Sequence, residues 1–240
     1  MDKKEALEII KKDGYELEHL SDHFKKDKEI VLEAVKETVK QNGDALVFAD
    51  ESLTKDKEIV LEAVKQFGLA LRYADESLKK DKKFILKAVK QHGYTLQYAD
   101  KSLSKDKKFI LEAQEQSYKA LTDGPILNFE KNIAWIDDSL KKDRKFMLEL
   151  MKQDGEAIVF ADKSLKKDKK FILKAVKQYG GALEHADKSL KKDKEVVLEA
   201  VKQGADDFKS VGFNLHYEEF ADESLRNDPD ILAILNKIKK

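Results

Sequence analysis

A segment of about 25 residues recurs along the chain, and this repeat limits the fold more than any other feature of the sequence. The copies that can be aligned open at Asp2, Asp27, Asp56, Asp81, Asp106, Asp143, Asp168, Asp193 and Asp228. The run from Ser77 to Gly93 is identical to the run from Ser164 to Gly180 except that Tyr179 replaces His92. Repeats of this length are typical of solenoids, in which each copy buries its apolar face against its neighbours.

Each repeat predicts two helices. The opening aspartate, such as Asp81, is a good N-cap because its carboxylate can accept hydrogen bonds from the first turn. In the helix of about eleven residues that follows, apolar side chains beginning with Phe84 and Ile85 share one broad face, and lysines occupy the other. We expect the glycine at its end, Gly93 here and Gly68, Gly155 and Gly180 elsewhere, to adopt the left-handed conformation that reverses the chain. A shorter second helix then carries a leucine and an aromatic residue.

These observations predict an all-α fold, an α-solenoid of about eight 25-residue helix-turn-helix repeats with a C-terminal capping helix after Asp228. Pro229 suits the first position of that helix, where its missing N–H costs nothing. No linker interrupts the pattern, so we expect a single helical-repeat domain over residues 1–240.

The repeat also resembles a known family. The run Ala-Leu-x-Tyr-Ala-Asp-x-Ser-Leu-Lys-Lys-Asp-Lys-x-Phe-Ile-Leu-x-Ala-Val-Lys-Gln-x-Gly resembles short tandem helical repeats catalogued only as a domain of unknown function. The resemblance covers nearly the whole chain and implies helical repeats in an array. It implies no catalytic residue, cofactor or substrate, so departures from the pattern carry more information than matches.

Two repeats contain long insertions, near residues 118–129 and 204–213. Insertions in solenoids map to loops and often to the binding face. The alternative is that these segments are repacked helices without a partner. Large side chains in and just after the insertions are the binding candidates, because aromatic residues dominate binding hot spots. They are Trp135, Phe129, Phe213, His216 and Tyr217.

Catalytic chemistry has little support in the sequence. The chain has no cysteine, which excludes disulfides, thiolate metal sites and cysteine nucleophiles. No GxSxG, phosphate-binding glycine loop or HExxH motif is present. His92 and His185 stand where other repeats place phenylalanine or tyrosine, which indicates packing. We therefore predict no catalytic residue, no cofactor and no metal site.

Charge is balanced overall but not locally. The 47 basic and 47 acidic side chains give zero net charge, which argues against a uniformly basic nucleic-acid binder. Residues 27–76 and 193–225 are acidic, whereas 79–111 and 163–192 are rich in lysine. Lysine-rich junctions of neighbouring repeats can attract a polyanion. Sequence-specific reading of bases favours arginine, and the chain has only Arg72, Arg144 and Arg226.

Three functions follow as hypotheses. The first is a non-enzymatic scaffold that binds a protein or peptide through the solenoid face and the irregular insertions. The second is weak polyanion or nucleic-acid binding through the lysine-rich junctions. The third, which the sequence favours least, is an enzyme whose site lies in the irregular fifth and eighth repeats. No stretch is long and apolar enough to span a membrane, and we expect a cytoplasmic monomer.

Overall fold

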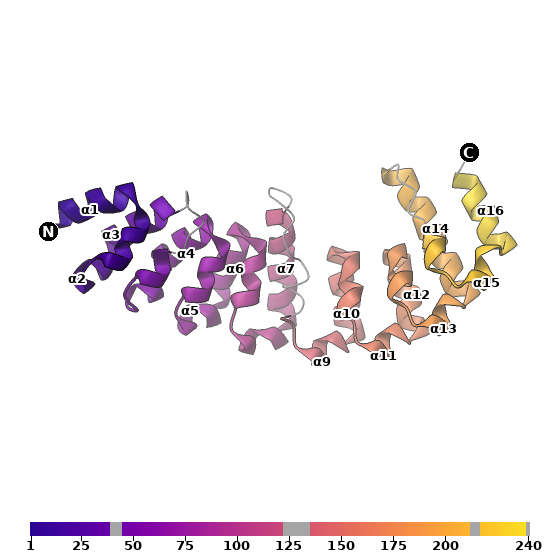
Figure 1. Ribbon diagram of the computed structural model, residues 1–240. Coiled ribbons are helices and arrows are strands. Elements are labelled where there is room, and N and C mark those ends of the chain that lie inside the picture. Colours follow the sequence, from indigo (N-terminus) through magenta and orange to yellow (C-terminus); the bar gives the residue numbers. More distant parts are fainter. Residues whose placement is uncertain (39–44, 122–134, 212–216, 239–240) are drawn as a thin grey trace. The chain divides into compact units, whose positions relative to one another are not determined.

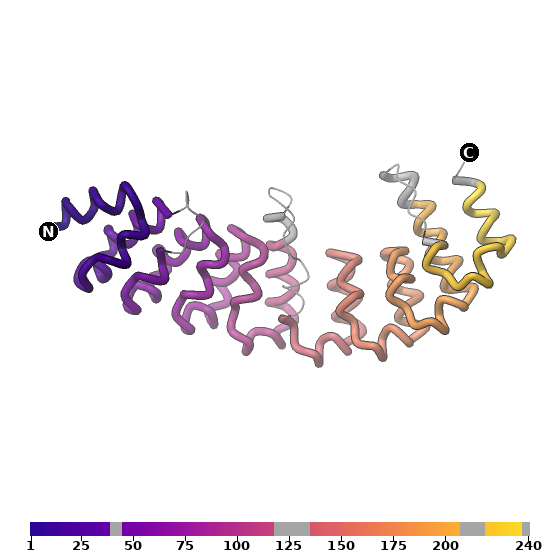
Figure 2. The backbone as a smooth tube through the Cα atoms, viewed as in Figure 1, coloured from indigo at the N-terminus to yellow at the C-terminus, as the bar shows by residue number. Residues whose placement is uncertain are grey.

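The computed structural model describes residues 1–38, 45–121, 135–211 and 217–238 (Figures 1 and 2). Within these ranges the chain is helical, and no strand is present. The structure divides into two compact units, Met1–Trp135 and Ile136–Lys240. In each unit the repeats stack as an α-solenoid, which confirms the predicted fold class. The single domain over residues 1–240 stays a prediction.

The N-terminal unit contains the first repeats. Its elements, with 3-10 helices written η, are α1 (Lys3–Lys12), η1 (Gly14–His19), α2 (Asp22–Lys25), α3 (Lys28–Glu37), η3 (Ala45–Phe48), η4 (Leu53–Lys55), α4 (Lys57–Gln66), η5 (Gly68–Tyr73), α5 (Glu76–Lys80), α6 (Lys82–Gln91), η6 (Gly93–Tyr98), η7 (Lys101–Lys105) and α7 (Lys107–Leu121).

The C-terminal unit continues the pattern. Its elements are α9 (Asp138–Lys141), α10 (Arg144–Gln153), η8 (Gly155–Phe160), α11 (Lys163–Lys166), α12 (Lys169–Gln178), η9 (Gly180–His185), α13 (Lys188–Lys191), α14 (Lys194–Val211), η10 (Tyr217–Phe220), α15 (Glu223–Arg226) and α16 (Pro229–Ile238). Helix α16 begins at Pro229, as predicted.

A regular repeat holds three helices where the sequence predicted two. In the repeat that opens at Asp56, the first helix is α4, and the Asp56 carboxylate caps it as predicted. The second helix, η5, is a six-residue 3-10 helix. The third is α5, capped by Asp75, whose Oδ1 accepts from the backbone N–H of Ser77. The sequence between the second helix and the next opening aspartate is therefore a short capped helix.

The helices of each unit form two layers. In the N-terminal unit α3, α4, α6 and α7 contact one another in order, and Figure 1 shows α4, α6 and α7 side by side. The 3-10 helices contact one another in a second layer, as η5 does with η6. Side chains from both layers form the core, and Ile59, Val60 and Leu71 are fully buried there. A single repeat could not bury these side chains alone, because neighbouring repeats pack against them.

The repeat glycine is not left-handed, contrary to the prediction. Gly68 and Gly93 each open a 3-10 helix, and the residue before each of them has an extended backbone that turns the chain. The glycine is needed because the next repeat approaches closely. A Cβ on Gly14 would lie 2.5 Å from the carbonyl oxygen of Ala34, and a Cβ on Gly68 would lie 2.7 Å from the Cβ of His92. No side chain fits at this position without moving the neighbouring repeat.

The insertions extend first helices wherever the structure describes them. Helix α7 runs to Leu121 and helix α14 runs to Val211, whereas regular first helices have ten residues. Tyr118 and Ala205 stand in these two repeats where others have the glycine that the close approach of the next repeat requires. Residues 122–134 and 212–216 lie outside the described ranges. The described part of both insertions is thus helix rather than loop.

Candidate functional site

A series of ion pairs joins the first helices of consecutive repeats. In the repeat that opens at Asp56, Oδ1 accepts from the backbone N–H groups of Glu58 and Ile59 at 2.9 and 3.2 Å. Its other oxygen, Oδ2, accepts from Lys28 of the preceding repeat at 2.8 Å. One carboxylate thus caps the first helix of its own repeat and pairs with a lysine of the preceding repeat. The same pairing, here called the carboxylate ladder, comprises Lys3–Asp27, Lys28–Asp56, Lys57–Asp81, Lys82–Asp106, Arg144–Asp168, Lys169–Asp193 and Lys194–Asp228.

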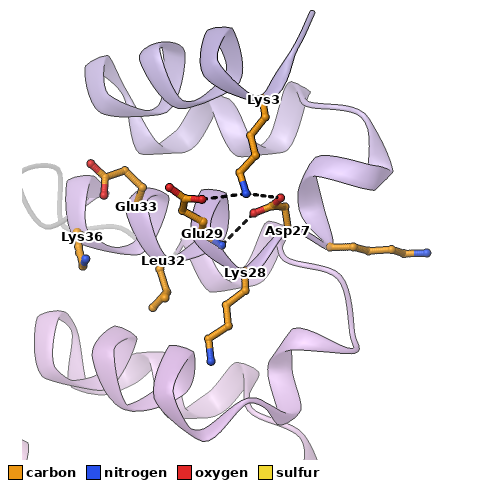
Figure 3. A pocket seen from close by; sticks show the side chains of 8 residues that line it. Lys3, Asp27, Lys28, Glu29, Leu32, Glu33 and Lys36 are labelled. Carbon is orange, nitrogen blue, oxygen red and sulfur yellow. Dashed lines mark hydrogen bonds and ion pairs between the residues drawn. The ribbon is translucent and has the colours of Figure 1, made fainter.

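A basic residue of the ladder pairs with one carboxylate or with two, and these pairings are here called single and double rungs. Lys3 lies between Asp27 and Glu29, with Nζ at 2.8 and 2.9 Å from their oxygens (Figure 3). These two hydrogen bonds raise the pKa of Lys3 above its usual value. In other repeats a lysine replaces this glutamate, as Lys83 does in the repeat that opens at Asp81. There the basic residue of the preceding repeat, Lys57, pairs with the aspartate alone. The hydrogen bond from Lys57 lowers the pKa of the Asp81 carboxyl.

A hollow lies beside the first ladder pairing, that of Lys3 with Asp27 and Glu29. It is lined by Lys3, Lys26, Asp27, Lys28, Glu29, Leu32, Glu33 and Lys36, several of them drawn in Figure 3. Lys3 and Lys28 are held in double rungs. Two of the four lysines that line the hollow are thus already paired with two carboxylates each, which reduces the charge that it presents to a ligand.

Some exposed lysines lie outside the ladder. Lys83, Lys87 and Lys90 follow one another along the exposed side of α6 and make no ion pair within the described residues. On the neighbouring helix α4 the equivalents of the first two are Glu58 and Glu62. Adjacent helices of one framework therefore present opposite charge.

A second hollow lies between the second and third helices of two neighbouring repeats. It has a volume of about 340 Å³ and is called the Val47 groove here. Val47, in η3, is 45% exposed, which is unusual in a chain whose other large apolar side chains are mostly buried. The next repeat contributes Tyr73, whose ring lies 4.5 Å from the guanidinium of Arg72. The lining residues are Leu46, Val47, Ala49, Glu51, Thr54, Tyr73, Ala74, Asp75 and Glu76.

Every charged side chain that lines the Val47 groove is acidic. Asp75 stays ionised because hydrogen bonds from the Ser77 hydroxyl and backbone lower the pKa of its carboxyl. Lys79 lies 2.9 Å from Glu76 and neutralises part of this charge. Glu51 is exposed and makes no ion pair within the described part of the chain. The groove thus combines one exposed valine with acidic side chains.

The same repeat positions in the C-terminal unit carry the opposite charge. Val159 takes the place of Val47 and is 40% exposed. Lys163, Lys166 and Lys188 replace Glu51, Thr54 and Glu76. Lys166 donates to the carbonyl oxygen of Val159 at 2.7 Å, and partial burial lowers the pKa of its ammonium group. The two apolar positions therefore have rims of opposite charge.

Val47 and Val159 are not among the residues predicted from the sequence, although the sequence carries a signal for them. Other repeats place Glu18, Arg72, Gln97 and Glu184 at this position, so an aliphatic residue there departs from the pattern. Such single departures are less conspicuous than insertions. A position-by-position comparison of exposed sites would have found them.

Of the predicted binding candidates, Trp135 is the one whose side chain the structure describes. It is 8% exposed, and its indole Nε1 donates to the carbonyl oxygen of Ala99 at 3.0 Å. Its ring also lies edge-on to that of Phe109, and its carbonyl oxygen accepts from Lys101. Trp135 is thus held in the repeat packing.

The other candidates lie in or next to segments outside the described ranges. Tyr217 begins η10, but its side chain lies outside the described part. Phe129, Phe213 and His216 also lie outside the described residues. The binding role of all five candidates stays a prediction.

Comparison with known proteins identifies one family. The model described as Domain of unknown function (DUF4116) matches five times in tandem, over residues 2–38, 35–79, 81–123, 126–166 and 168–216. No curated protein and no solved structure matches the chain. Among the described residues, no helix is long and apolar enough to cross a bilayer, and no three potential metal ligands gather.

Proposed function

The chain belongs to the DUF4116 family, and we propose that it is a non-enzymatic scaffold that binds a protein or a peptide. The observation that carries this proposal is the Val47 groove, where an exposed apolar side chain lies between two repeats. A ligand that fills the hollow would remove the exposed part of this side chain from water, which is favourable. The same position is charged or polar in several other repeats, so the valine is not needed for packing.

The recurring polar residues favour a scaffold over an enzyme. Opening aspartates such as Asp81 cap a helix and bind the neighbouring repeat. Aspartates such as Asp75 cap the third helix and bind the following serine. Their recurrence has a structural cause, and the function is therefore sought in residues that differ between repeats.

Selection from a random peptide library displayed on phage tests the proposal, with the folded full chain as bait. We expect enrichment of related peptides that bind the folded chain and not the same chain unfolded in urea. A library that yields no enriched peptide, from a bait whose folding is confirmed by circular dichroism, would contradict a peptide-binding scaffold. Deleting residues 118–129 or 204–213 in parallel tests the insertions as the binding surface.

Polyanion binding is the second candidate, and the unpaired lysines of α6 favour it. Lys83, Lys87 and Lys90 leave three charges along one helix. Fluorescence anisotropy with a short DNA duplex at low salt should reveal weak binding that falls with salt concentration. Replacing Lys83 and Lys87 by glutamate gives α6 the residues of α4 and should weaken the binding, and the same change at Lys170 and Lys174 of α12 should weaken it further. Absence of binding at low salt would remove this candidate.

We also propose that the scaffold is a cytoplasmic monomer. Light scattering coupled to gel filtration tests the monomer, and a dimer mass would contradict it. Cell fractionation tests the location, and recovery outside the cytoplasm would contradict it.

A further inference from the structure

We infer that the Val47 groove binds an extended peptide segment in which an apolar side chain is flanked by lysine or arginine. This inference rests on the proposed scaffold function and names the chemistry of its partner. The groove lies within the N-terminal unit and is formed by residues 46–54 of one repeat and 73–76 of the next.

The size of the groove favours a peptide over a folded domain. Its volume of about 340 Å³ lies at the lower end of the range for ligand pockets, roughly 300–1,000 Å³. Val47 and Tyr73 lie on opposite repeats and border it. A space of this size accommodates one or two side chains of an extended segment, with the remaining residues outside.

The charge of the rim selects the flanking residues. Glu51, Asp75 and Glu76 surround the apolar floor, and no basic side chain lines the groove. Lys55 and Lys79 lie behind this rim, 3.7 Å from Asp75 and 2.9 Å from Glu76, so neutralisation is partial. Complementary charge orients an approaching segment and excludes acidic ones.

The Tyr73 ring does not supply the cation site. Arg72 already lies 4.5 Å from its centroid and donates to its hydroxyl at 2.6 Å. A basic partner would therefore pair with the exposed carboxylates of Glu51 and Glu76. This pairing predicts binding that weakens as salt screens the exposed charges.

The C-terminal unit offers an internal control for this chemistry. Val159 is exposed to a similar extent as Val47, at 40% against 45%. Its surroundings carry Lys163 and Lys188 in place of Glu51 and Glu76. A basic segment should therefore avoid this position although the same apolar side chain is present.

A titration of the ¹⁵N-labelled full chain followed by NMR tests the inference. The probe is a short synthetic peptide with one leucine between lysines, and the control peptide has glutamates in place of the lysines. We expect chemical-shift changes confined to residues 46–54 and 73–76 with the basic peptide only. Shifts elsewhere, or equal binding of both peptides, would overturn the assignment.

Val47→Ser, with Val159→Ser as its matched control, separates groove binding from general attraction. Both side chains are exposed, so both variants should fold. We expect Val47→Ser to weaken the basic peptide about threefold, because Val47 is 45% exposed and burying that part of a valine is worth about 0.7 kcal/mol. Val159→Ser should leave the affinity unchanged. Equal affinity of Val47→Ser and the unaltered chain would overturn the groove as the binding site.

The two proposals fail in distinguishable ways. If phage display yields peptides whose binding survives Val47→Ser, the scaffold function stands and the groove assignment falls. If display yields no peptide and the basic probe causes no shift, both fall.

Discussion

The segments around Val47 and Val159 share a framework and differ in surface charge. In the first, the backbone N–H of Asp75 donates to the carbonyl oxygen of Thr54 of the preceding repeat at 3.0 Å. In the second, the N–H of Asp187 donates to the carbonyl oxygen of Lys166 at 2.9 Å. Yet Glu51 and Glu76 beside the first valine are replaced by Lys163 and Lys188 beside the second, whereas the cap aspartate is kept. Repeat packing therefore constrains the framework and leaves the rim free to vary.

The difference follows from where each interaction lies. Cap aspartates accept backbone hydrogen bonds and close one repeat on the next, so their replacement changes folding. Glu51 and Glu76 project into solvent, where substitutions usually change stability by less than about 0.5 kcal/mol. The framework should hence respond to mutation with stability changes, and the rim with binding changes.

Truncating the core phenylalanine should have the largest effect and should be equal in both units. Phe84 and Phe171 occupy the same repeat position and are 2% and 0% exposed. We expect Phe84→Ala and Phe171→Ala each to lower the free energy of unfolding by about 3–5 kcal/mol, because each leaves a cavity. Urea denaturation measures both. A large difference between the stability losses of the two variants would contradict a shared framework.

Glycine substitutions should give the next largest loss of stability. They test whether the glycine is needed for close packing between repeats. Gly14→Ala places a methyl group 2.5 Å from the backbone oxygen of Ala34, which cannot move away. We expect a loss of about 1–3 kcal/mol. In the control Gly181→Ala, the new methyl group meets the far end of the Tyr179 side chain, which can swing aside by giving up its hydrogen bond to Glu156, and the loss should be about 1 kcal/mol. Thermal unfolding of both variants tests this ranking, and equal losses would contradict it.

Replacing a ladder aspartate should give the smallest loss of stability. This loss has two parts, one from the ion pair and one from the helix cap. Asp81→Asn removes the charge that pairs with Lys57 but keeps a capping oxygen, and should cost about 0.2–1 kcal/mol. Asp81→Ala also removes the cap and should cost about 0.5–2 kcal/mol more. Chemical denaturation distinguishes them. Equal stability of the two variants would mean that the cap contributes nothing.

The ladder also predicts a pH dependence with a definite sign. The hydrogen bond from Lys57 lowers the pKa of Asp81 below its ordinary value of 3.8. A lowered folded-state pKa stabilises the fold above the unfolded value, and this contribution is lost as the pH falls through the folded pKa. The stability gap between the unaltered chain and Asp81→Asn should thus be widest near neutral pH and close in acid. A gap that widens in acid would contradict the ladder.

The sequence was sufficient for the fold class because the apolar spacing and the cap aspartates recur in every repeat. It was insufficient for the role of the glycine, since a close approach between repeats leaves no local signal in the chain. The same holds for the ladder, because the lysine that pairs with Asp81 lies 24 residues earlier. Interactions between repeats become visible only once the stacking is known.

The candidate site was harder to predict for a different reason. Aromatic residues near insertions are conspicuous, and Trp135 was singled out on that ground, but the structure places its side chain in the packing. The Val47 groove depends on small differences at an exposed position in two adjacent repeats. Such a site is evident only when the surface of each repeat is compared with that of its counterparts.

The central claim is that rim chemistry can be changed without disturbing the framework. The double variant Glu51→Lys, Glu76→Lys gives the Val47 groove two of the three lysines found around Val159, the equivalents of Lys163 and Lys188. Peptide titration and urea denaturation of this variant form the most direct test. We predict that the groove then prefers the glutamate peptide to the lysine peptide, while the free energy of unfolding changes by less than about 0.5 kcal/mol. An unchanged preference for the lysine peptide, or a loss of several kcal/mol in stability, would contradict the account.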